Sequence, residues 1–380
     1  MINITKKEHC CGCNACGQIC PKSCISMDND MEGFWYPKVN ENLCINCGLC
    51  EKVCPIIHVN TNEECIESYA AYTNIHSVRK CSSSGGIFTL LTREILDEDG
   101  IVFGVALTSD FSEATHVEIT RFEDIHKIQG SKYLQSRTKD TFKRVKEYLI
   151  QGKKVLYSGV ACQIAGLNNY LQKEYKNLYT VDVLCHGVPS PKIWQKYLKE
   201  KKNEFNEKID SIEFRNKETG WKKFSFHIKF SIGNTYSKRF YEDNYFKIFL
   251  GNIGLRPSCH DCKYKDLERP SDISLGDYWG IEKQLPEMDD DKGTSVILLH
   301  SEKGLELFEN IKKDLRYVSV DPNKALPITS DSRHSVSKHR KRSIFFECLE
   351  SQSIEELVGM LRVPVYKRIL RKIKQIIKKS

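Results

Sequence analysis

The chain lacks the long apolar run that a membrane-spanning helix needs, because no stretch of roughly 18 apolar residues occurs in it. Its first residues, MINITKKEHC, also lack the apolar core of a signal peptide. No Gly-x-Gly-x-x-Gly motif follows a strand and no Walker loop is present, so nothing supports a nicotinamide or nucleoside triphosphate site. With 380 residues, 40% of them hydrophobic and 28% charged, the sequence predicts a globular cytoplasmic protein of more than one domain.

Cysteine, by contrast, is abundant. The chain has 17 cysteines, and because thiols stay reduced in the cytoplasm, they predict metal ligation rather than disulfides. The pattern Cys-x-x-Cys-x-x-Cys-x-x-x-Cys-Pro occurs twice near the N-terminus. The first run contains Cys10, Cys13, Cys16 and Cys20, and the second contains Cys44, Cys47, Cys50 and Cys54.

This spacing favours iron–sulfur clusters over zinc. A structural zinc site usually takes two well-separated pairs of ligands, whereas three closely spaced cysteines suit three corners of a cubane. In two-cluster ferredoxins the fourth cysteine of each run ligates the other cluster. We therefore predict two 4Fe–4S clusters, one held by Cys10, Cys13, Cys16 and Cys54 and the other by Cys44, Cys47, Cys50 and Cys20. Cys11 and Cys24 are surplus to this scheme.

The order of predicted elements divides the chain into a small module and a larger domain. Residues 1–58 are predicted to form an α+β ferredoxin-like module, and the polar, aperiodic residues 59–68 a linker. From residue 69 to residue 345, strands and helices alternate, which predicts an α/β domain with parallel pairing. Period-two alternation within 209–240 predicts an antiparallel β insert. Residues 346–380 are predicted to be a helical C-terminal segment.

Four further cysteines stand where ligands are expected. Cys162 and Cys185 each follow a predicted strand, and functional residues of such sheets tend to lie at strand ends. Cys259 and Cys262 have the two-residue gap of a metal knuckle. Free cysteines are also common as small buried hydrophobes, so spacing alone leaves both interpretations of Cys162 and Cys185 open.

Two glycine-containing loops are candidates for phosphate binding. The stretch CSSSGGIFTLL, with Ser84, Gly85 and Gly86, begins a predicted helix, whose free N–H groups can hold a phosphate. The stretch IQGSKYLQS places Ser131 and Lys132 in a second turn. For an isolated Ser-Gly stretch, an ordinary serine cap is the better explanation.

Six stretches together resemble the beta subunit of coenzyme F420 hydrogenases and dehydrogenases, in family order between residues 66 and 345. They are SSSGGIFTLL, IQGSKYLQS, GKKVLYSGVACQIAGL, DVLCHGVPSPKIW, CHDCKYKDLERPSDISLGDYWG and DKGTSVILL. The chain departs from the family in one place, because Val160 and Ala161 stand where the family usually has Thr-Pro.

The resemblance implies FAD in the domain of residues 69–345. It makes Ser84, Gly85, Gly86, Ser131 and Lys132 candidates for contacts with that FAD. It also implies a third 4Fe–4S cluster, for which the ligands would be Cys162, Cys185, Cys259 and Cys262. His186 and Asp277 would tune this cluster, although each is equally well explained as a satisfied polar residue at a strand end.

The formal net charge of +8 is concentrated in the tail VPVYKRILRKIKQIIKKS, residues 363–380. A basic amphipathic helix can lie on an anionic membrane surface, and the alternative is a terminal helix that packs on its own domain. Nucleic-acid binding would explain the charge but not the cysteines, so we expect none.

Three functions follow from these observations. The first is an iron–sulfur flavoprotein oxidoreductase, which receives electrons from ferredoxin or a redox partner subunit and acts on an organic substrate or a deazaflavin-type coenzyme. In this function the protein side chains orient the substrate, and the sequence singles out none as catalytic. The second is an electron-relay subunit without a substrate of its own, and the third is a zinc-stabilised basic binding protein.

Overall fold

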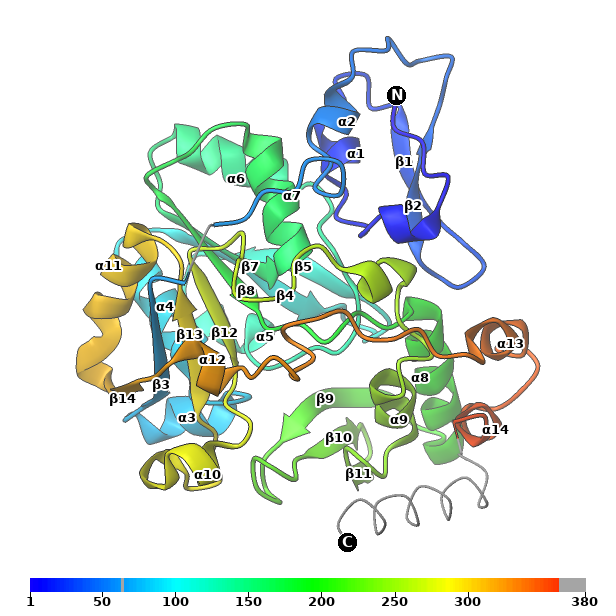
Figure 1. The fold of residues 1–380 in the computed structure, drawn as a ribbon. Coiled ribbons are helices and arrows are strands. Elements are labelled where there is room, and N and C mark those ends of the chain that lie inside the picture. The colour runs from blue at the N-terminus through cyan, green and yellow to red at the C-terminus, as the bar shows by residue number, and fades with distance from the viewer. Residues whose placement is uncertain (63–64, 362–380) are drawn as a thin grey trace, which may run out of the picture.

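A large mixed sheet forms the centre of the protein (Figure 1). The computed structural model describes residues 1–62 and 65–361, and within them the sheet has nine strands in the order β14-β3-β13-β12-β8-β7-β4-β5-β6. The bounds are β3 Glu67–Thr73, β4 Ile101–Leu107, β5 Ala114–Ile119, β6 Ser136–Arg137, β7 Val155–Val160, β8 Leu178–Val183, β12 Ile273–Asp277, β13 Ser295–Leu299 and β14 Leu315–Ser319. The prediction of a mixed α/β fold is confirmed. We call residues 67–361 the α/β body.

The middle of this sheet is parallel, because β12 pairs with β8, β8 with β7 and β7 with β4 in the same direction. These strands are apolar and mostly buried, as expected for strands covered by helices on both faces. The covering helices are α4 Ile87–Asp97, α6 Thr141–Ile150, α7 Ala161–Leu171 and α11 Glu302–Ile311. Consequently the ends of β7 and β8, which precede Cys162 and Cys185, lie at the same edge of the sheet.

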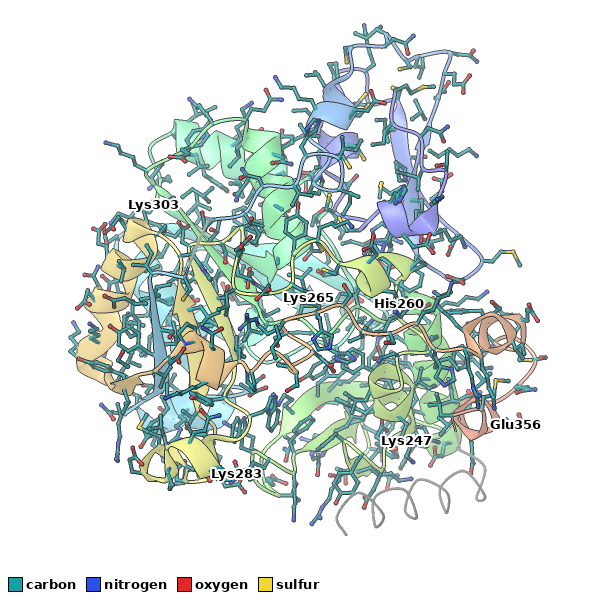
Figure 2. All side chains as sticks on the ribbon, viewed as in Figure 1. Lys247, His260, Lys265, Lys283, Lys303 and Glu356 are labelled. Carbon is teal, nitrogen blue, oxygen red and sulfur yellow. The ribbon has the colours of Figure 1, made fainter. Side chains whose placement is uncertain are left out.

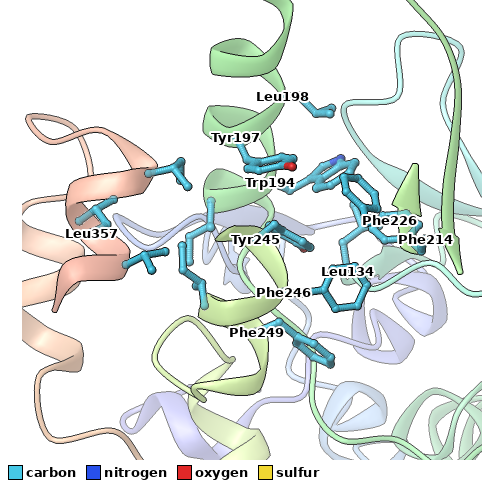
Figure 3. Packing of buried hydrophobic residues seen from close by; sticks show 14 of the residues in the cluster. Leu134, Trp194, Tyr197, Leu198, Phe214, Phe226, Tyr245, Phe246, Phe249 and Leu357 are labelled. Carbon is cyan, nitrogen blue, oxygen red and sulfur yellow. The ribbon is translucent and has the colours of Figure 1, made fainter. Parts of the chain in front are cut away.

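A three-stranded antiparallel sheet, in the order β11-β10-β9, forms the predicted insert. Its strands are β9 Ile209–Asn216, β10 Ser225–Phe230 and β11 Thr235–Arg239, and it packs with α8 Pro191–Phe205 and α9 Asn244–Leu250. Trp194 lies in this aromatic core, stacked on Tyr197, tilted against Phe214 and edge-to-face with Tyr245 (Figure 3). The core holds α8 and α9 in place, and the segment that follows α9 leads to Cys259.

Residues 1–58, which we call the N-terminal module, lie at one end of the molecule, next to α6 and α7 (Figure 1). The module contains α1 Ala15–Ile19, α2 Leu49–Lys52 and an antiparallel hairpin of β1 Ile25–Asn29 and β2 Trp35–Val39. A buried ion pair between Glu32 and Arg342 joins the hairpin to the body. The module is therefore packed against the body rather than separate from it.

The predicted linker over 59–68 is wrong at its C-terminal end, because β3 begins at Glu67. The described part of the segment is also held in place: the Asn62 N–H donates to the carbonyl of Arg269 at 2.9 Å, and its side-chain amide donates to the carbonyl of Ser271 at 2.8 Å. Composition alone does not indicate that the polar side chain of Asn62 is hydrogen-bonded to backbone of the body.

The C-terminal part of the described chain contains two short helices, α13 Arg342–Glu347 and α14 Ile354–Gly359. The basic tail predicted over 363–380 lies outside the described residues. Among the residues that are described, no helix is both long and apolar enough to cross a membrane.

Candidate iron–sulfur centres

The eight cysteines of the N-terminal module line two cavities. The outer cavity, with about 360 Å³ of empty space, is lined by Cys20, Cys44, Cys47 and Cys50, together with Cys24. The inner cavity, with about 320 Å³, is lined by Cys10, Cys13, Cys16 and Cys54, together with Cys11. Each cavity therefore contains three cysteines of one run and the fourth of the other, which is the exchanged arrangement that the spacing predicts.

Tight backbone turns allow each run to wrap around its cavity. Gly12 and Gly48 have φ angles of +73° and +74°, which a residue with a side chain adopts only with strain. Asn14, with φ +64°, precedes α1 in the same left-handed conformation, which asparagine tolerates best among residues with a side chain. The residues between the cysteines therefore turn the backbone so that three thiols of a run line one cavity.

The two cavities differ in burial. Cys10, Cys13, Cys16 and Cys54 are all buried, whereas Cys47 is exposed and Cys20 and Cys44 are half-buried. Burial raises the pKa of Cys54 to about 11 and also raises the pKa of Cys16. Such thiols stay protonated at neutral pH unless a cation binds them, and binding of a metal would release their protons.

The body brings the four other predicted cysteines together. Cys162 lies in the first turn of α7, Cys185 follows β8, and Cys259 lies in the 3-10 helix η3 Pro257–Asp261, with Cys262 next to its end. Cys162 and Cys185 are each in electrostatic contact with Cys262, as is Cys259 with Cys185. We call these four residues the third cysteine set. Burial raises the pKa of Cys259 to about 12.

Cys11, which the spacing left without a role, lies between the inner cavity and the third cysteine set. Its side chain packs in one cluster with Cys13 and Cys162, and the interaction with these two thiols holds the pKa of Cys11 well below that of an ordinary thiol. Tyr264 lies beside the same thiols and donates its hydroxyl to the carbonyl of Pro55. The inner cavity and the third set are thus neighbours, a relation that no spacing within either motif could reveal.

Polar side chains of the body hold the first cysteine loop by its backbone. Gln135 donates to the carbonyl of Cys11 at 3.1 Å, and Thr138 donates to the carbonyl of Cys13 at 2.8 Å. Gly166 of α7 approaches so closely that an added Cβ would lie 2.9 Å from the Cys13 sulfur. The body therefore fixes the position of the inner cavity.

The polar residues predicted beside the third set make other contacts. The His186 ring lies 2.7 Å from the Asn252 side-chain oxygen and 3.2 Å from the Asp331 carboxylate, and burial lowers its pKa. Asp277 pairs with Arg215 and accepts the Trp221 indole N–H at 2.9 Å. Lys265, labelled in Figure 2, donates to the carbonyls of Cys185 and His186.

The two loops predicted to contact FAD lie side by side. The Ser131 N–H donates to the Ser83 hydroxyl at 2.8 Å, which joins the loops. Ser84 Oγ is buried without a hydrogen-bond partner among the described residues. Gly85, however, faces the sheet, because an added Cβ would lie 2.4 Å from the carbonyl of Ala71, and its N–H donates to Ser295 Oγ at 3.0 Å. Gly86, with φ +87°, is the N-cap of α4.

Three cationic side chains surround these loops. Lys132 donates to the carbonyl of Gln129 at 2.8 Å, and desolvation lowers its pKa to about 7. Lys217 donates to the carbonyls of Arg79 and Ser84, and burial lowers its pKa to about 8. Arg215 is buried, and its Nε and Nη2 atoms have no acceptor among the described residues. The sequence did not point to Arg215 or Lys217, which lie far along the chain from both loops.

The arrangement of the cysteines differs from that of a site for one metal ion. Within residues 1–62 and 65–361, no three His, Cys, Asp or Glu side chains are grouped so that they could hold a single ion. A 4Fe–4S cluster instead takes one thiolate at each of four separate iron corners. Four cysteines spread around a cavity suit such a cluster.

Comparison with known families identifies this class of protein. A 4Fe-4S dicluster domain matches residues 9–56. The N-terminal model of the coenzyme F420 hydrogenase/dehydrogenase beta subunit matches residues 68–143, and the C-terminal model matches residues 152–324. The protein is therefore an iron–sulfur redox protein that transfers electrons. It belongs to the coenzyme F420 hydrogenase/dehydrogenase beta subunit family, as the resemblance of its motifs implied.

Individual relatives match parts of the chain. It is 25% identical over 187 residues to the coenzyme F420-dependent sulfite reductase of Methanocaldococcus jannaschii, a match that covers 47% of this chain and 28% of the reductase. It is 32% identical over 74 residues to a ferredoxin of Saccharopolyspora erythraea, covering 19% of this chain and 65% of the ferredoxin. Under two thirds of each relative is therefore spanned. A chain of the F420-reducing [NiFe] hydrogenase complex from Methanosarcina barkeri aligns with a TM-score of 0.46 and 18% identity, over 78% of this chain and 90% of that one.

Proposed function

We propose that the protein is an iron–sulfur flavoprotein oxidoreductase that passes electrons between its N-terminal module and FAD in the α/β body, and so reduces or oxidises an organic substrate or a deazaflavin-type coenzyme. The observation that carries the proposal is the packing of Cys11 with Cys13 and Cys162 in one cluster, since it joins the cysteines of the module to those of the body. The proposal assigns residues 1–58 to a cluster-binding domain and residues 69–345 to a flavin-binding domain.

The cysteines of the outer and inner cavities would hold two 4Fe–4S clusters of a ferredoxin-like module, and the third cysteine set would hold another. Such clusters exchange single electrons. Ferredoxin or a redox partner subunit would exchange electrons at the outer cavity, because its Cys47 is exposed whereas the inner cysteines are buried.

The exchange of fourth ligands gives the first test. In Cys54→Ala we expect about four irons to be lost from the inner cavity, and in Cys20→Ala about four from the outer cavity, because each variant removes a corner ligand from a different cluster. Iron, acid-labile sulfide and the electron paramagnetic resonance (EPR) spectrum of the reduced, anaerobically prepared protein would be measured. The two variants should lose different components of the spectrum.

A matched control is Cys24→Ala, because the sulfur of Cys24 lies 3.3 Å from that of Cys20 and lines the same cavity. This variant should keep its full iron content. Zinc in place of iron and sulfide in the wild-type protein would refute the iron–sulfur assignment and favour the zinc-stabilised binding protein. Identical spectra for Cys54→Ala and Cys20→Ala would refute the exchanged ligands alone.

The flavin part of the proposal rests on the paired loops around Ser83 and Ser131. Ser84 Oγ and two nitrogens of Arg215 lack partners, so they offer hydrogen bonds to an acceptor-rich ligand. Lys132 and Lys217 add positive charge that suits the FAD pyrophosphate. FAD would supply hydride exchange with the substrate. Gly85 and Gly86 would shape the loop rather than touch FAD, because both pack against protein atoms.

We expect Lys132→Met to weaken FAD binding about tenfold or more, since a hydrogen bond to a charged group contributes about 1.5–3 kcal/mol. Burial lowers the pKa of Lys132 to about 7, so wild-type protein should bind FAD more tightly at pH 6, where the ammonium is protonated, than at pH 9. The variant should lose this pH dependence. The Kd of FAD for deflavinated protein would be measured by fluorescence quenching.

The control for this experiment is Lys127→Met, which removes an exposed lysine that pairs with Asp124 nearby in the chain. It should bind FAD with the wild-type Kd at both pH values. If Lys132→Met and wild-type protein bind FAD with equal affinity at pH 6, FAD binds away from Lys132 and the proposed site is wrong. Absence of any bound flavin in anaerobically purified wild-type protein would favour the electron-relay function.

A further inference from the structure

Arg256 is a buried arginine that contacts Cys10, one of the residues that line the inner cavity. It precedes η3, its backbone N–H donates to the carbonyl of Val188 at 2.9 Å, and the residue is 0% exposed. The guanidinium reaches the first cysteine loop: Nε donates to the carbonyl of Cys10 at 2.8 Å, and Nη2 lies 3.5 Å from the Cys10 sulfur. Arg256 therefore touches one of the predicted cluster ligands directly.

The remaining donors of Arg256 fix its orientation. Nη2 also donates to the carbonyl of Trp35 at 2.9 Å, and Nη1 donates to the Gln135 side-chain oxygen at 3.2 Å. The guanidinium carbon lies 4.5 Å from the ring centroid of Tyr36, in cation–π contact. All three guanidinium nitrogens of Arg256 are therefore held by hydrogen bonds. The planar guanidinium loses little entropy on making them, and a lysine ammonium could not make the same set of contacts.

The positive charge of Arg256 has no carboxylate partner among the described residues. Each of the four other buried arginines pairs with a carboxylate: Arg79 with Asp290, Arg215 with Asp277, Arg269 with Asp182 and Arg342 with Glu32. A buried charge that lacks an opposite charge is costly. The titratable groups that interact with Arg256 are Cys10 first, then Tyr36, Cys11 and Cys259, and Cys10 would carry negative charge as a thiolate ligand of a cluster.

We infer that Arg256 is the counter-charge of the inner iron–sulfur cluster, and that its charge and its N–H contact with the Cys10 sulfur raise the reduction potential of that cluster above the potential of the outer one. This inference rests on the proposed function. Reduction adds one electron, taken from an external one-electron donor, and no bond or proton changes. The added negative charge is stabilised by a fixed cation in a water-poor site. The outer cavity has Lys22, which is exposed, so solvent and salt screen it.

The test is a redox titration of the anaerobically prepared full chain, followed by EPR. The inner and outer signals are identified by their loss in Cys54→Ala and Cys20→Ala. In Arg256→Gln, which keeps an amide donor but removes the charge, we expect the ratio of reduced to oxidised inner cluster at a fixed potential to fall about tenfold. For a one-electron couple this corresponds to about 59 mV. The outer midpoint should stay unchanged.

Two further variants separate charge from general disturbance. Arg256→Lys keeps the charge and should shift the inner midpoint less than Arg256→Gln. Arg137→Gln removes an arginine that lies over the Trp35 ring at 4.2 Å without touching a sulfur, and it should shift neither midpoint. An unchanged inner midpoint in Arg256→Gln, or equal shifts in both clusters, would overturn the inference.

The wild-type protein supplies a test that needs no Arg256 variant. If its inner cluster has a midpoint at or below that of the outer cluster, the inference is wrong even where Arg256→Gln fails to fold. Failure of the proposed function looks different, because the protein would then contain no iron and no acid-labile sulfide to titrate.

Discussion

Replacing Arg269 with methionine should lower the free energy of unfolding by about 3–5 kcal/mol, because the change leaves a buried carboxylate without its partner. Arg269 and Asp182 are both 0% exposed, and two guanidinium nitrogens of Arg269 lie 2.8 and 3.2 Å from the Asp182 carboxylate. Arg269 also donates to the carbonyls of Tyr264 and Val183, at 3.0 Å each. Urea unfolding of the anaerobically prepared chain would measure the loss.

This ion pair matters for the site as well as for stability. Val183 ends β8 just before Cys185, and Tyr264 follows Cys262, so Arg269 ties two parts of the third cysteine set together. The double variant Asp182→Leu with Arg269→Met should recover part of the lost stability, since it removes both charges. Arg121→Met, which breaks an exposed pair with Asp124, should leave the urea midpoint unchanged. A similar midpoint for Arg269→Met and Arg121→Met would contradict the prediction.

Replacing Cys185 with alanine should lower the iron content from about twelve to about eight atoms per chain, because a 4Fe–4S cluster held by the third cysteine set needs a ligand at every corner. The clusters of the N-terminal module would be held by other cysteines. The EPR components that Cys54→Ala and Cys20→Ala remove should therefore persist in this variant. Iron and acid-labile sulfide per protein would be measured alongside the reduced spectrum.

Cys81→Ala is the matched control, because Cys81 is an exposed cysteine that lines neither cavity. It should keep the wild-type iron content. An iron content of about eight in wild-type protein that Cys185→Ala does not change would mean that the third set holds no cluster. Its four cysteines would then be small, half-buried side chains packed against the core.

Features that depend on local spacing were predictable from the sequence. Three cysteines with two residues between neighbours must turn around a common centre, and the short separation between Cys10 and Cys16 leaves little freedom in where they point. The same holds for the buried strand over 101–107, because an apolar run bounded by Gly100 and polar residues is a local signal. The placement of Cys54 with the first run followed from the known exchange of fourth ligands.

Contacts between distant segments were not predictable. Arg256 is more than half the chain away from Cys10, and a single arginine in the apolar stretch NIGLRPSC is a weak signal, although a charge in such surroundings hints at burial. Gly85 was expected to face a ligand because glycine allows close approach, but the approaching group is the carbonyl of Ala71 in β3. Sequence shows that space is needed there and does not show what fills it.

The manner in which the body holds the first cysteine loop has a consequence for kinetics. Gln135, Thr138 and Arg256 bind backbone carbonyls of the loop, and Asn62 is pinned to the body just beyond the module. The distance between the inner cavity and Cys162 is therefore set by packing. It does not depend on the motion of a domain on a flexible linker. Electron exchange within the chain then needs no search for a docking geometry, and solvent viscosity should influence only the encounter with an external partner.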